Sequence, residues 1–207
     1  NAMRVLSVFG TRPEAIKMAP VVRELSHREG IVSRVCASAQ HRAMLDQALH
    51  LFGIVPDVDL DVMRADQTPT DVAAAVLTGL QEVFDRERPD WVLVQGDTTT
   101  AAAAAWAAYH ARIRVGHVEA GLRSGDKWQP YPEEVNRRMV SVIADLHLAP
   151  TKGARCNLLA EGVEAQRVVV TGNPVIDAFH WVSALPCDLS VGPLAGIDWS
   201  KRVLLVT

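Results

Sequence analysis

The chain has 207 residues, of which 49% are hydrophobic and 22% charged, so it holds enough apolar material for a sizeable core. The formal charge of −3 does not indicate a basic surface, so nucleic acid is not expected as a partner. No apolar run reaches the roughly 18 residues of a membrane span, so a membrane is not expected either. The three cysteines are odd in number and far apart, which indicates neither a disulfide framework nor a metal site and favours a reducing cytoplasm. Asn1 and Ala2, before Met3, are interpreted as an expression-tag remnant.

Strand and helix patterns alternate along the chain. Short apolar runs predict strands at 4–9, 31–39, 58–62, 90–96, 114–120, 144–150 and 167–172. Helical spacing of apolar residues predicts helices at 15–28, 41–52, 68–88, 101–111, 132–144, 151–162 and 173–185. Thr68 is a candidate cap, Pro132 a candidate first helical residue, and Gly53 and Gly162 candidate stops. Because the strands are apolar on both faces, we predict an α/β fold with a doubly wound parallel sheet of about seven strands.

The pattern changes after Leu185, where Pro, Gly, Ser and Asp become frequent. We therefore expect an N-terminal domain at 3–184, a linker at 185–201 and, at 202–207, the first strand of a C-terminal domain. A strand without its following helix indicates that the sequence is cut inside a longer protein.

The segment 116–138 carries a dense group of polar side chains. Glu119 ends a buried strand, where an unpaired carboxylate is costly, so we expect Arg123 or a substrate hydroxyl as its partner. Glu133 and Glu134 begin the next helix, and the helix dipole alone accounts for one of them. We assign Glu134 to that helix-start role.

Asp97 follows a buried strand at the same edge of the predicted sheet. An aspartate before three threonines is commonly an N-cap, but those hydroxyls can cap equally well, so a carboxylate directed into the cleft is the alternative. Asp97, Glu119 and Glu133 together would form a carboxylate cluster, which pushes pKa values apart and suits proton abstraction and donation. Two further polar residues lie one turn into the same helix as Glu133, namely Asn136 and Arg137.

The turn at 10–14, between the first strand and the first helix, has two interpretations. Backbone N–H groups and the helix dipole there favour an anion, to which Arg12 and Lys17 would add charge. The dinucleotide fingerprint GxGxxG is absent, and Glu14 would lie near any pyrophosphate. Phosphate binding and a plain capped turn therefore stay equally supported.

Other polar positions are less informative. The segment 40–42, which is Gln40, His41 and Arg42, either contacts a ligand or is a solvated helix start. His117 is interpreted as a core or hydrogen-bonded residue, and the turn at 171–174 as structural.

Six segments in register resemble the non-hydrolysing bacterial UDP-N-acetylglucosamine 2-epimerases. They are GTRPEAIKMAP (10–20), QHRAMLDQ (40–47), VQGDTTTA (94–101), GHVEAGLRSGD (116–126), PEEVNRR (132–138) and TGNPVIDA (171–178). The resemblance runs from Met3 to about Val182 and implies a two-domain fold of the GT-B type, with the substrate in the cleft between two Rossmann-like halves and only the first half present.

The resemblance also implies a reaction. The family converts UDP-N-acetylglucosamine reversibly to UDP-N-acetylmannosamine, through elimination of UDP to a 2-acetamidoglucal and its re-addition, without a redox cofactor. It implies Asp97, Glu119 and Glu133 as acid and base residues. The residues expected to bind the substrate are Arg12, Lys17, His117, Arg123, Asn136 and Arg137. A cytoplasmic homodimer that serves cell-surface polysaccharide biosynthesis, with UDP as the other bound partner, completes this expectation.

Two further expectations concern activity and regulation. In the family, most uridine and diphosphate contacts belong to the second domain, so we expect the 207-residue chain to be folded but essentially inactive. Members that their own substrate activates use Gln40, His41 and Arg42 with an arginine just before a Gln-Thr pair, and Asp66 stands at that position here. An acidic residue would repel a second UDP, so we expect weak or absent substrate activation.

Three other functions compete with epimerisation. A GT-B glycosyltransferase shares the architecture but usually needs only one base. A hydrolysing relative would release N-acetylmannosamine and UDP. A nucleotide-sugar-binding module without catalysis would tolerate Asp97→Asn and Glu119→Gln.

Overall fold

The computed structural model describes residues 2–38, 42–62, 64 and 66–204. The strands of the described chain are β1 Met3–Phe9, β2 Ile31–Ala37, β3 Val58–Asp59, β4 Trp91–Gln95, β5 Arg114–Val118, β6 Leu146–Ala149 and β7 Val168–Val170. The helices are α1 Arg12–Ser26, α2 Arg42–Leu51, α3 Pro69–Glu87, α4 Thr99–His110, α5 Glu133–Ile143, α6 Lys152–Ala160 and α7 Pro174–Ser183. Two short 3-10 turns, η1 Ala165–Arg167 and η2 Gly192–Leu194, complete the structure.

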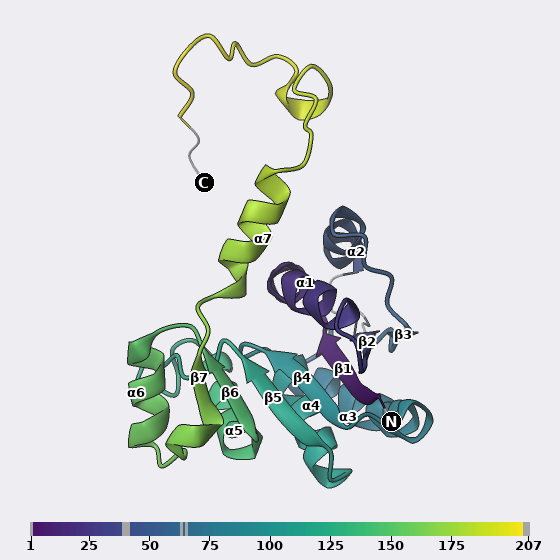
Figure 1. Cartoon of the computed structure of the whole chain (residues 1–207), viewed down its shortest axis with the longest axis vertical. Coiled ribbons are helices and arrows are strands. Elements are labelled where there is room, and N and C mark those ends of the chain that lie inside the picture. Colours follow the sequence, from purple (N-terminus) through teal and green to yellow (C-terminus); the bar gives the residue numbers. More distant parts are fainter. Residues whose placement is uncertain (1, 39–41, 63, 65, 205–207) are drawn as a thin grey trace.

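The strands form one parallel sheet in the order β3-β2-β1-β4-β5-β6-β7. The chain winds outward from β1 to β3 and then returns to place β4 on the other side of β1 (Figure 1). This reversal is the topological switch point, at which doubly wound sheets bind ligands beyond the carboxyl ends of their strands. The predicted doubly wound, Rossmann-like sheet is confirmed.

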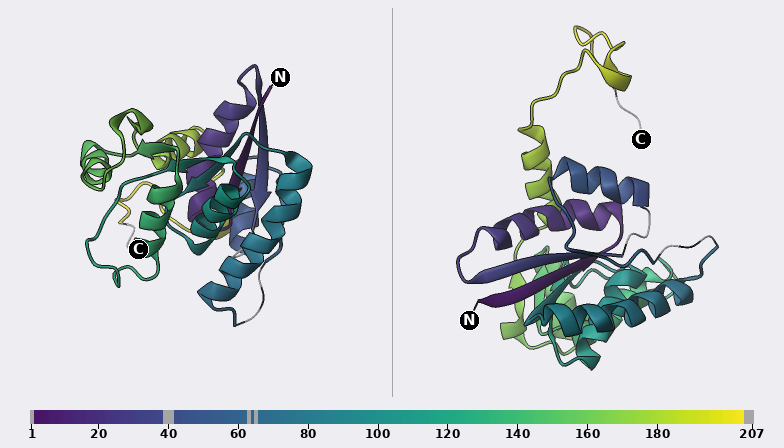
Figure 2. Two further views of the ribbon diagram at one scale, coloured as in Figure 1. Left: turned by 90° about the horizontal axis from the view of Figure 1, so that it is seen from below. Right: turned by 90° about the vertical axis from the view of Figure 1, so that its right-hand side faces the viewer.

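Helices cover both faces of the sheet. On one face, α1 and α2 pack on side chains such as Val5, Phe9 and Leu93. On the opposite face, α3 and α4 pack on Leu6 and Val92 (Figure 2). Alternate residues of one strand thus enter opposite cores, which is why the strand segments are apolar throughout.

The helix ends follow local chemistry. Thr68 caps α3 through a capping box with Asp71, and Gly53 adopts the left-handed conformation (φ 63°) that a β-carbon would disfavour. Pro132 was expected as the first helical residue of α5, which is wrong. It is the N-cap residue, with φ −90° and ψ 9°, and α5 begins at Glu133. The third strand is also shorter than predicted, since only Val58 and Asp59 pair with β2.

The chain beyond α7 extends away from the body of the domain (Figure 1). The helix itself is held by Ala178, which packs with Ala19 and Phe52, and by Trp181, over whose ring the Arg23 guanidinium lies 4.4 Å from the centroid. Residues 202–204 are irregular, and 205–207 lie outside the described residues, so the strand predicted at 202–207 stays a prediction. Within the described ranges, no helix combines the length and apolarity required to cross a bilayer.

Candidate active site

Glu119 lies directly after β5 and is 9% exposed. Its Oε2 accepts from Lys17 Nζ at 2.6 Å and from Gln95 Nε2, and its Oε1 accepts from Asn173 Nδ2 at 2.6 Å. The backbone of Glu119 is left-handed (φ 64°), a conformation that a non-glycine residue keeps only where its surroundings enforce it. These donors come from α1, β4 and the β7–α7 turn, so the fold assembles the carboxylate's environment from distant segments.

Asp97 follows β4 and pairs with Arg137 of α5, with 2.5 Å between Oδ2 and Nη2. The amide of Asn136 donates to the main-chain carbonyl of Asp97 at 3.0 Å, which fixes the turn as well as the side chain. Burial raises the pKa of Asp97, Arg137 opposes the rise, and the nearby charges of Glu133 and Glu119 add to it. The net effect holds Asp97 closer to its protonated form than an exposed aspartate.

Glu133 opens α5 beside Asp97. Its Oε2 is buried and has no hydrogen-bond partner among the described residues. Glu133 also lines a cavity of about 430 Å³, together with Thr11, Arg64, Asp66 and Thr98. A carboxylate oxygen that is desolvated but unbound is available to a ligand. The Asp97, Glu119 and Glu133 carboxylates are therefore brought to one edge of the sheet.

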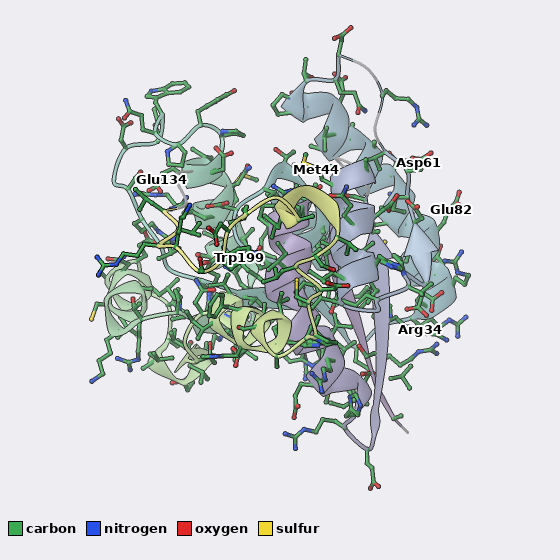
Figure 3. The ribbon with its side chains drawn as sticks, turned by 90° about the horizontal axis from the view of Figure 1, so that it is seen from above. Arg34, Met44, Asp61, Glu82, Glu134 and Trp199 are labelled. Atoms are coloured by element: carbon green, nitrogen blue, oxygen red, sulfur yellow. The ribbon has the colours of Figure 1, made fainter. Side chains whose placement is uncertain are left out.

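Glu134 does more than begin a helix, so its assignment to a helix-start role was too narrow. Its side chain, labelled in Figure 3, is fully buried. It accepts from the backbone N–H groups of Ser124 (3.0 Å) and Gly125 (3.3 Å), and pairs with Arg138 at 3.1 Å. Burial acts to raise its pKa, but these donors outweigh it and leave the pKa lowered. Arg137 lies 3.6 Å away, so Glu134 supports both the loop after β5 and the arginine that pairs with Asp97.

Of the two partners expected for Glu119, Arg123 is wrong, and a substrate hydroxyl stays a prediction. Its guanidinium faces Glu161 instead, with Nε and Nη2 at 2.8 and 2.6 Å from the two carboxylate oxygens. The remaining contacts are to Ser141 Oγ (2.9 Å) and the Leu122 carbonyl (2.7 Å). Four of the five N–H donors of Arg123 are thus occupied by protein, which places this residue in a structural pair; its substrate-binding role stays a prediction.

His117 is fully buried in β5, as expected of a core or hydrogen-bonded histidine. Its Nε2 lies 2.7 Å from the carbonyl oxygen of Gly96, and its Nδ1 has no partner among the described residues. Burial lowers its pKa to about 4, so the ring is neutral at physiological pH, with the proton on Nε2. Through Gly96, His117 holds the turn that presents Asp97; contact with a substrate stays a prediction.

The turn after β1 is a capped turn, and the backbone N–H groups that were expected to bind a phosphate donate to Glu14 instead. Glu14 Oε2 accepts from the N–H groups of Gly10 (3.0 Å) and Thr11 (2.8 Å), while Oε1 accepts from Thr98 Oγ1 at 2.6 Å. The carboxylate of Glu14 therefore occupies the place that a bound phosphate would take. Gly10 is required here, because a β-carbon on it would lie 1.9 Å from Ser38 Oγ.

The two cationic side chains predicted to act at this turn, Arg12 and Lys17, differ in their contacts. Arg12 is exposed and has no side-chain partner among the described residues, whereas Lys17 is committed to Glu119. Gln40 and His41 lie outside the described residues, and of Arg42 only the backbone, at the start of α2, is described. The regulatory role of 40–42 stays a prediction.

Comparison with known proteins places this arrangement in a family. A model of the family described as UDP-N-acetylglucosamine 2-epimerase matches residues 23–207. The chain belongs to this family. It is 50% identical, over 212 residues, to the UDP-N-acetylglucosamine 2-epimerase of Yersinia pestis, covering 99% of this chain and 56% of that protein.

Solved epimerase structures agree with the fold. The UDP-GlcNAc 2-epimerase of Neisseria meningitidis, bound to UDP-GlcNAc, superposes with a TM-score of 0.85 at 51% identity, over 87% of this chain and 48% of that one. The Methanocaldococcus jannaschii enzyme, in complex with UDP-GlcNAc and UDP, superposes with a TM-score of 0.82 at 35% identity, over 86% and 49% of the two chains. The chain spans about half the length of the epimerases it matches.

Sequence reasoning missed two residues that donate hydrogen bonds to Glu119. Gln95 ends β4 and donates to Glu119, and its signal is a polar residue at the end of an otherwise apolar strand. Asn173 was interpreted as part of a structural turn, but its amide also reaches Glu119. Nothing in the local sequence indicates that second contact, because the two residues are 54 positions apart.

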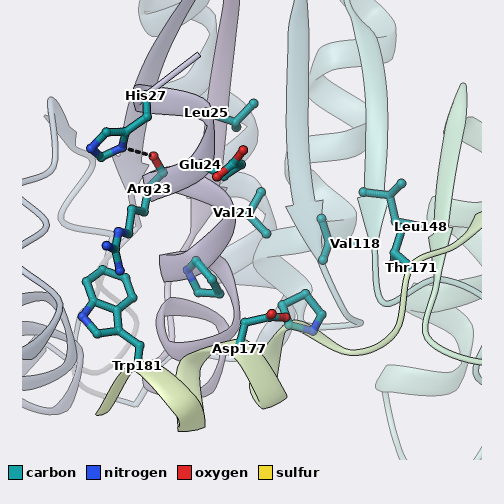
Figure 4. Close-up of a pocket in the computed structure, with 12 residues that line it drawn as sticks. Val21, Arg23, Glu24, Leu25, His27, Val118, Leu148, Thr171, Asp177 and Trp181 are labelled. Carbon is teal, nitrogen blue, oxygen red and sulfur yellow. Dashed lines mark hydrogen bonds between the residues drawn. The ribbon is translucent and has the colours of Figure 1, made fainter. Parts of the chain in front are cut away.

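A second cavity lies outside the carboxylate cluster. It has a volume of about 780 Å³, lies between α1, α7 and the edge of β5 and β6, and is lined by residues that include Arg23, Glu24, Asp177 and Trp181 (Figure 4). None of the predicted site residues with described side chains lines it. In the described part of the chain, no three His, Cys, Asp or Glu side chains are grouped to hold a metal ion.

Proposed function

We propose that this chain supplies one wall of the active site of an enzyme that interconverts UDP-N-acetylglucosamine and UDP-N-acetylmannosamine. The observation that carries the proposal is the convergence of Asp97, Glu119 and Glu133 at the carboxyl edge of the sheet, next to Lys17 and Arg137. Ligand-bound relatives support the substrate, since the Neisseria enzyme is described as bound to UDP-GlcNAc.

Inversion at C2 requires two proton transfers. In the first step a base removes the C2 proton, the C1=C2 double bond forms, and the C1–O bond breaks with its electron pair on the departing UDP. In the second step UDP adds back to C1 of the 2-acetamidoglucal while an acid delivers a proton to the other face of C2. The C2 proton is weakly acidic, so a positioned base and stabilisation of the diphosphate are both needed.

The arrangement of charges suits these transfers. The Glu119 carboxyl accepts hydrogen bonds from Lys17 and Asn173, whereas burial and acidic neighbours raise the pKa of Asp97. Two carboxyl groups in such different surroundings can serve the two faces of C2, with Glu133 as the third candidate. We leave open which of the three removes the proton. The cations Arg12, Lys17 and Arg137 are the proposed diphosphate contacts of this wall.

The whole protein is proposed to be a cytoplasmic homodimer of the GT-B type, with this chain as its first half. The other wall of the cleft would lie in the remaining part, so the 207-residue chain alone is expected to be folded but inactive. Asp66 lines the 430 Å³ cavity with Glu133 and is expected to disfavour a second UDP, which predicts weak substrate activation. A sigmoidal rate curve that Gln40→Ala abolishes would contradict this last expectation.

Product analysis by NMR in D2O, with the full-length protein and UDP-N-acetylglucosamine, tests the proposal. We expect UDP-N-acetylmannosamine with deuterium at C2. Free N-acetylmannosamine and UDP as the main products would instead show hydrolysis, and sugar transfer to an acceptor without C2 deuterium would show a glycosyltransferase. Substrate binding without turnover, unchanged in Asp97→Asn and Glu119→Gln, would show a binding module.

A further inference from the structure

Asn173 stands in the turn between β7 and α7, and its side-chain amide makes two hydrogen bonds. Oδ1 accepts from the backbone N–H of Val175 at 3.1 Å, which caps α7, and Nδ2 donates to Glu119 Oε1 at 2.6 Å. The cap needs the amide oxygen, so the NH2 group is the part that faces the carboxylate. One side chain therefore begins a helix and binds a residue of the proposed active site.

The three donors to Glu119 are not equivalent. Lys17 and Gln95 both donate to Oε2, and two bonds that converge on one oxygen leave the carboxylate able to rotate about that point. Among the described residues, Asn173 is the one hydrogen-bond partner of Oε1. The bond from Asn173 fixes the plane of the carboxylate and hence the direction of its lone pairs.

We propose that Asn173 is a positioning residue for Glu119, and that its N-cap bond ties the plane of that carboxylate to the first turn of α7. The inference rests on the proposed function, in which Glu119 exchanges a proton with the substrate. Since α7 connects the sheet to the extended segment beyond Ser183, a displacement of its first turn would move the donor and turn the carboxylate.

The charged surroundings of Glu119 set what a substitution will do. Lys17 faces it from α1, Asp97 lies close enough to feel its charge, and His117 on β5 is neutral. Asn173, like Gln95, is an uncharged donor to Glu119. A carboxylate in its place would lie against a second carboxylate, and two such groups share a proton.

Two substitutions separate the contact with Glu119 from the cap. Serine and aspartate are both good N-caps, but Asn173→Ser lacks the NH2 donor and Asn173→Asp replaces it with an acceptor. In the full-length protein we expect Asn173→Ser to lower kcat about tenfold with KM within about twofold of wild type. We expect Asn173→Asp to move the limb of the kcat/KM pH profile that reports Glu119 upward by about one unit or more.

Thr151→Ala is the matched control, because Thr151 caps α6 through Ala154 and does not contact Glu119. It should lower the melting temperature and leave kcat and the pH profile unchanged. Wild-type kcat and pH profile in both Asn173 variants would overturn the inference. An equal loss of kcat in Thr151→Ala and Asn173→Ser would also overturn it. A disturbed helix start that does not contact Glu119 would then be enough to lower kcat.

A readout without turnover keeps this inference separate from the proposed function. The ¹³C signal of the Glu119 carboxyl, assigned by its disappearance in Glu119→Gln, should change position in Asn173→Ser and stay in place in Thr151→Ala. If wild type shows no C2 exchange, the proposed function fails and the signal still decides whether Asn173 holds Glu119. An unmoved signal in Asn173→Ser contradicts the positioning role.

Discussion

Glu14 and Glu119 are both buried glutamates at the carboxyl edge of the same sheet, yet they obtain their hydrogen bonds differently. Glu14 is held by Gly10 and Thr11, within four residues of it, and by one remote hydroxyl, that of Thr98. Glu119 is held entirely by remote side chains, including Lys17, which is 102 residues away. Local donors make Glu14 a helix cap, whereas Glu119 acquires its partners only when the sheet has formed.

This difference separates stability from function. Removing Glu14 should weaken a structural unit and spare the chemistry, because its donors belong to the backbone of a turn. Removing the charge of Glu119 should spare the fold and affect the chemistry, because its partners form part of the proposed site.

Glu119→Gln is expected to lower kcat of the full-length protein by about 10³-fold, which is the range of general acid–base catalysis. The amide keeps the size of the side chain but turns one acceptor oxygen into an NH2 group that faces a donor, so we expect a moderate fall in the melting temperature with the chain still folded. Steady-state kinetics with UDP-N-acetylglucosamine and thermal melts measure both. The exposed Glu164→Gln is the control and should match wild type; a Glu119→Gln kcat within tenfold of wild type would contradict the assignment.

His117 should make stability depend on pH. Its pKa falls from the ordinary 6.5 to about 4 in the folded chain. The stabilisation that the neutral ring gives the folded state is therefore fully present above pH 6.5 and is lost as the pH falls toward 4. The integrated loss is about 3 kcal/mol in the free energy of unfolding. Burial also lowers the pKa of His147, which adds a slope of the same sign.

Urea titrations between pH 4 and 7 isolate the share of His117. The slope of the free energy of unfolding against pH should decrease in His117→Gln. In the exposed His50→Gln it should stay as in wild type. An identical slope in wild type and His117→Gln would show that the imidazole is not held neutral.

Glu14→Ala should reduce the free energy of unfolding by about 2 kcal/mol, because it leaves buried donors of Gly10, Thr11 and Thr98 without their acceptor. The kcat of the folded fraction should stay within about twofold of wild type. Asp71→Ala removes the matching carboxylate from the exposed capping box of α3 and should cost less, about 1 kcal/mol. A large loss of kcat in Glu14→Ala at full folding would place Glu14 in the site.

Arg123→Lys tests the assignment of Arg123 to a structural pair with Glu161. Lysine cannot form the bidentate contact, so we expect a loss of about 1 kcal/mol in stability and a KM for UDP-N-acetylglucosamine within about twofold of wild type. Lys17→Met is the comparison and should raise KM. A KM that rises more in Arg123→Lys than in Lys17→Met would restore Arg123 as a substrate contact.

The sequence separation between interacting residues also explains which features could be predicted. Element order, the capping box at Thr68 and the left-handed Gly53 follow from residues within a few positions of one another, and each is found in the structure. The partner of Glu119 depends on how α1 lies across the switch point, so the local sequence predicts Arg123 or a substrate hydroxyl and gives no sign of the distant Lys17. Pattern alone carries no information on that packing.

The carboxylates themselves were predictable for a related reason. An acidic residue at the end of a buried strand is costly unless the fold provides donors, so Asp97 and Glu119 stand out from the apolar segments before them. Asn173 does not stand out, because a cap explains it completely within its own turn. Its second contact becomes visible only in the assembled structure.

Deuterium incorporation at C2 of UDP-N-acetylglucosamine in D2O, measured for the full-length protein with Glu14→Gln or Glu119→Gln, distinguishes a structural glutamate from a catalytic one. Glutamine keeps the shape of both side chains, removes the charge and replaces one acceptor oxygen with an NH2 group. We expect Glu14→Gln to incorporate deuterium at close to the wild-type rate and Glu119→Gln to lose the exchange. Equal rates in the two variants, or loss of exchange in Glu14→Gln alone, would contradict the separation of a structural from a catalytic glutamate.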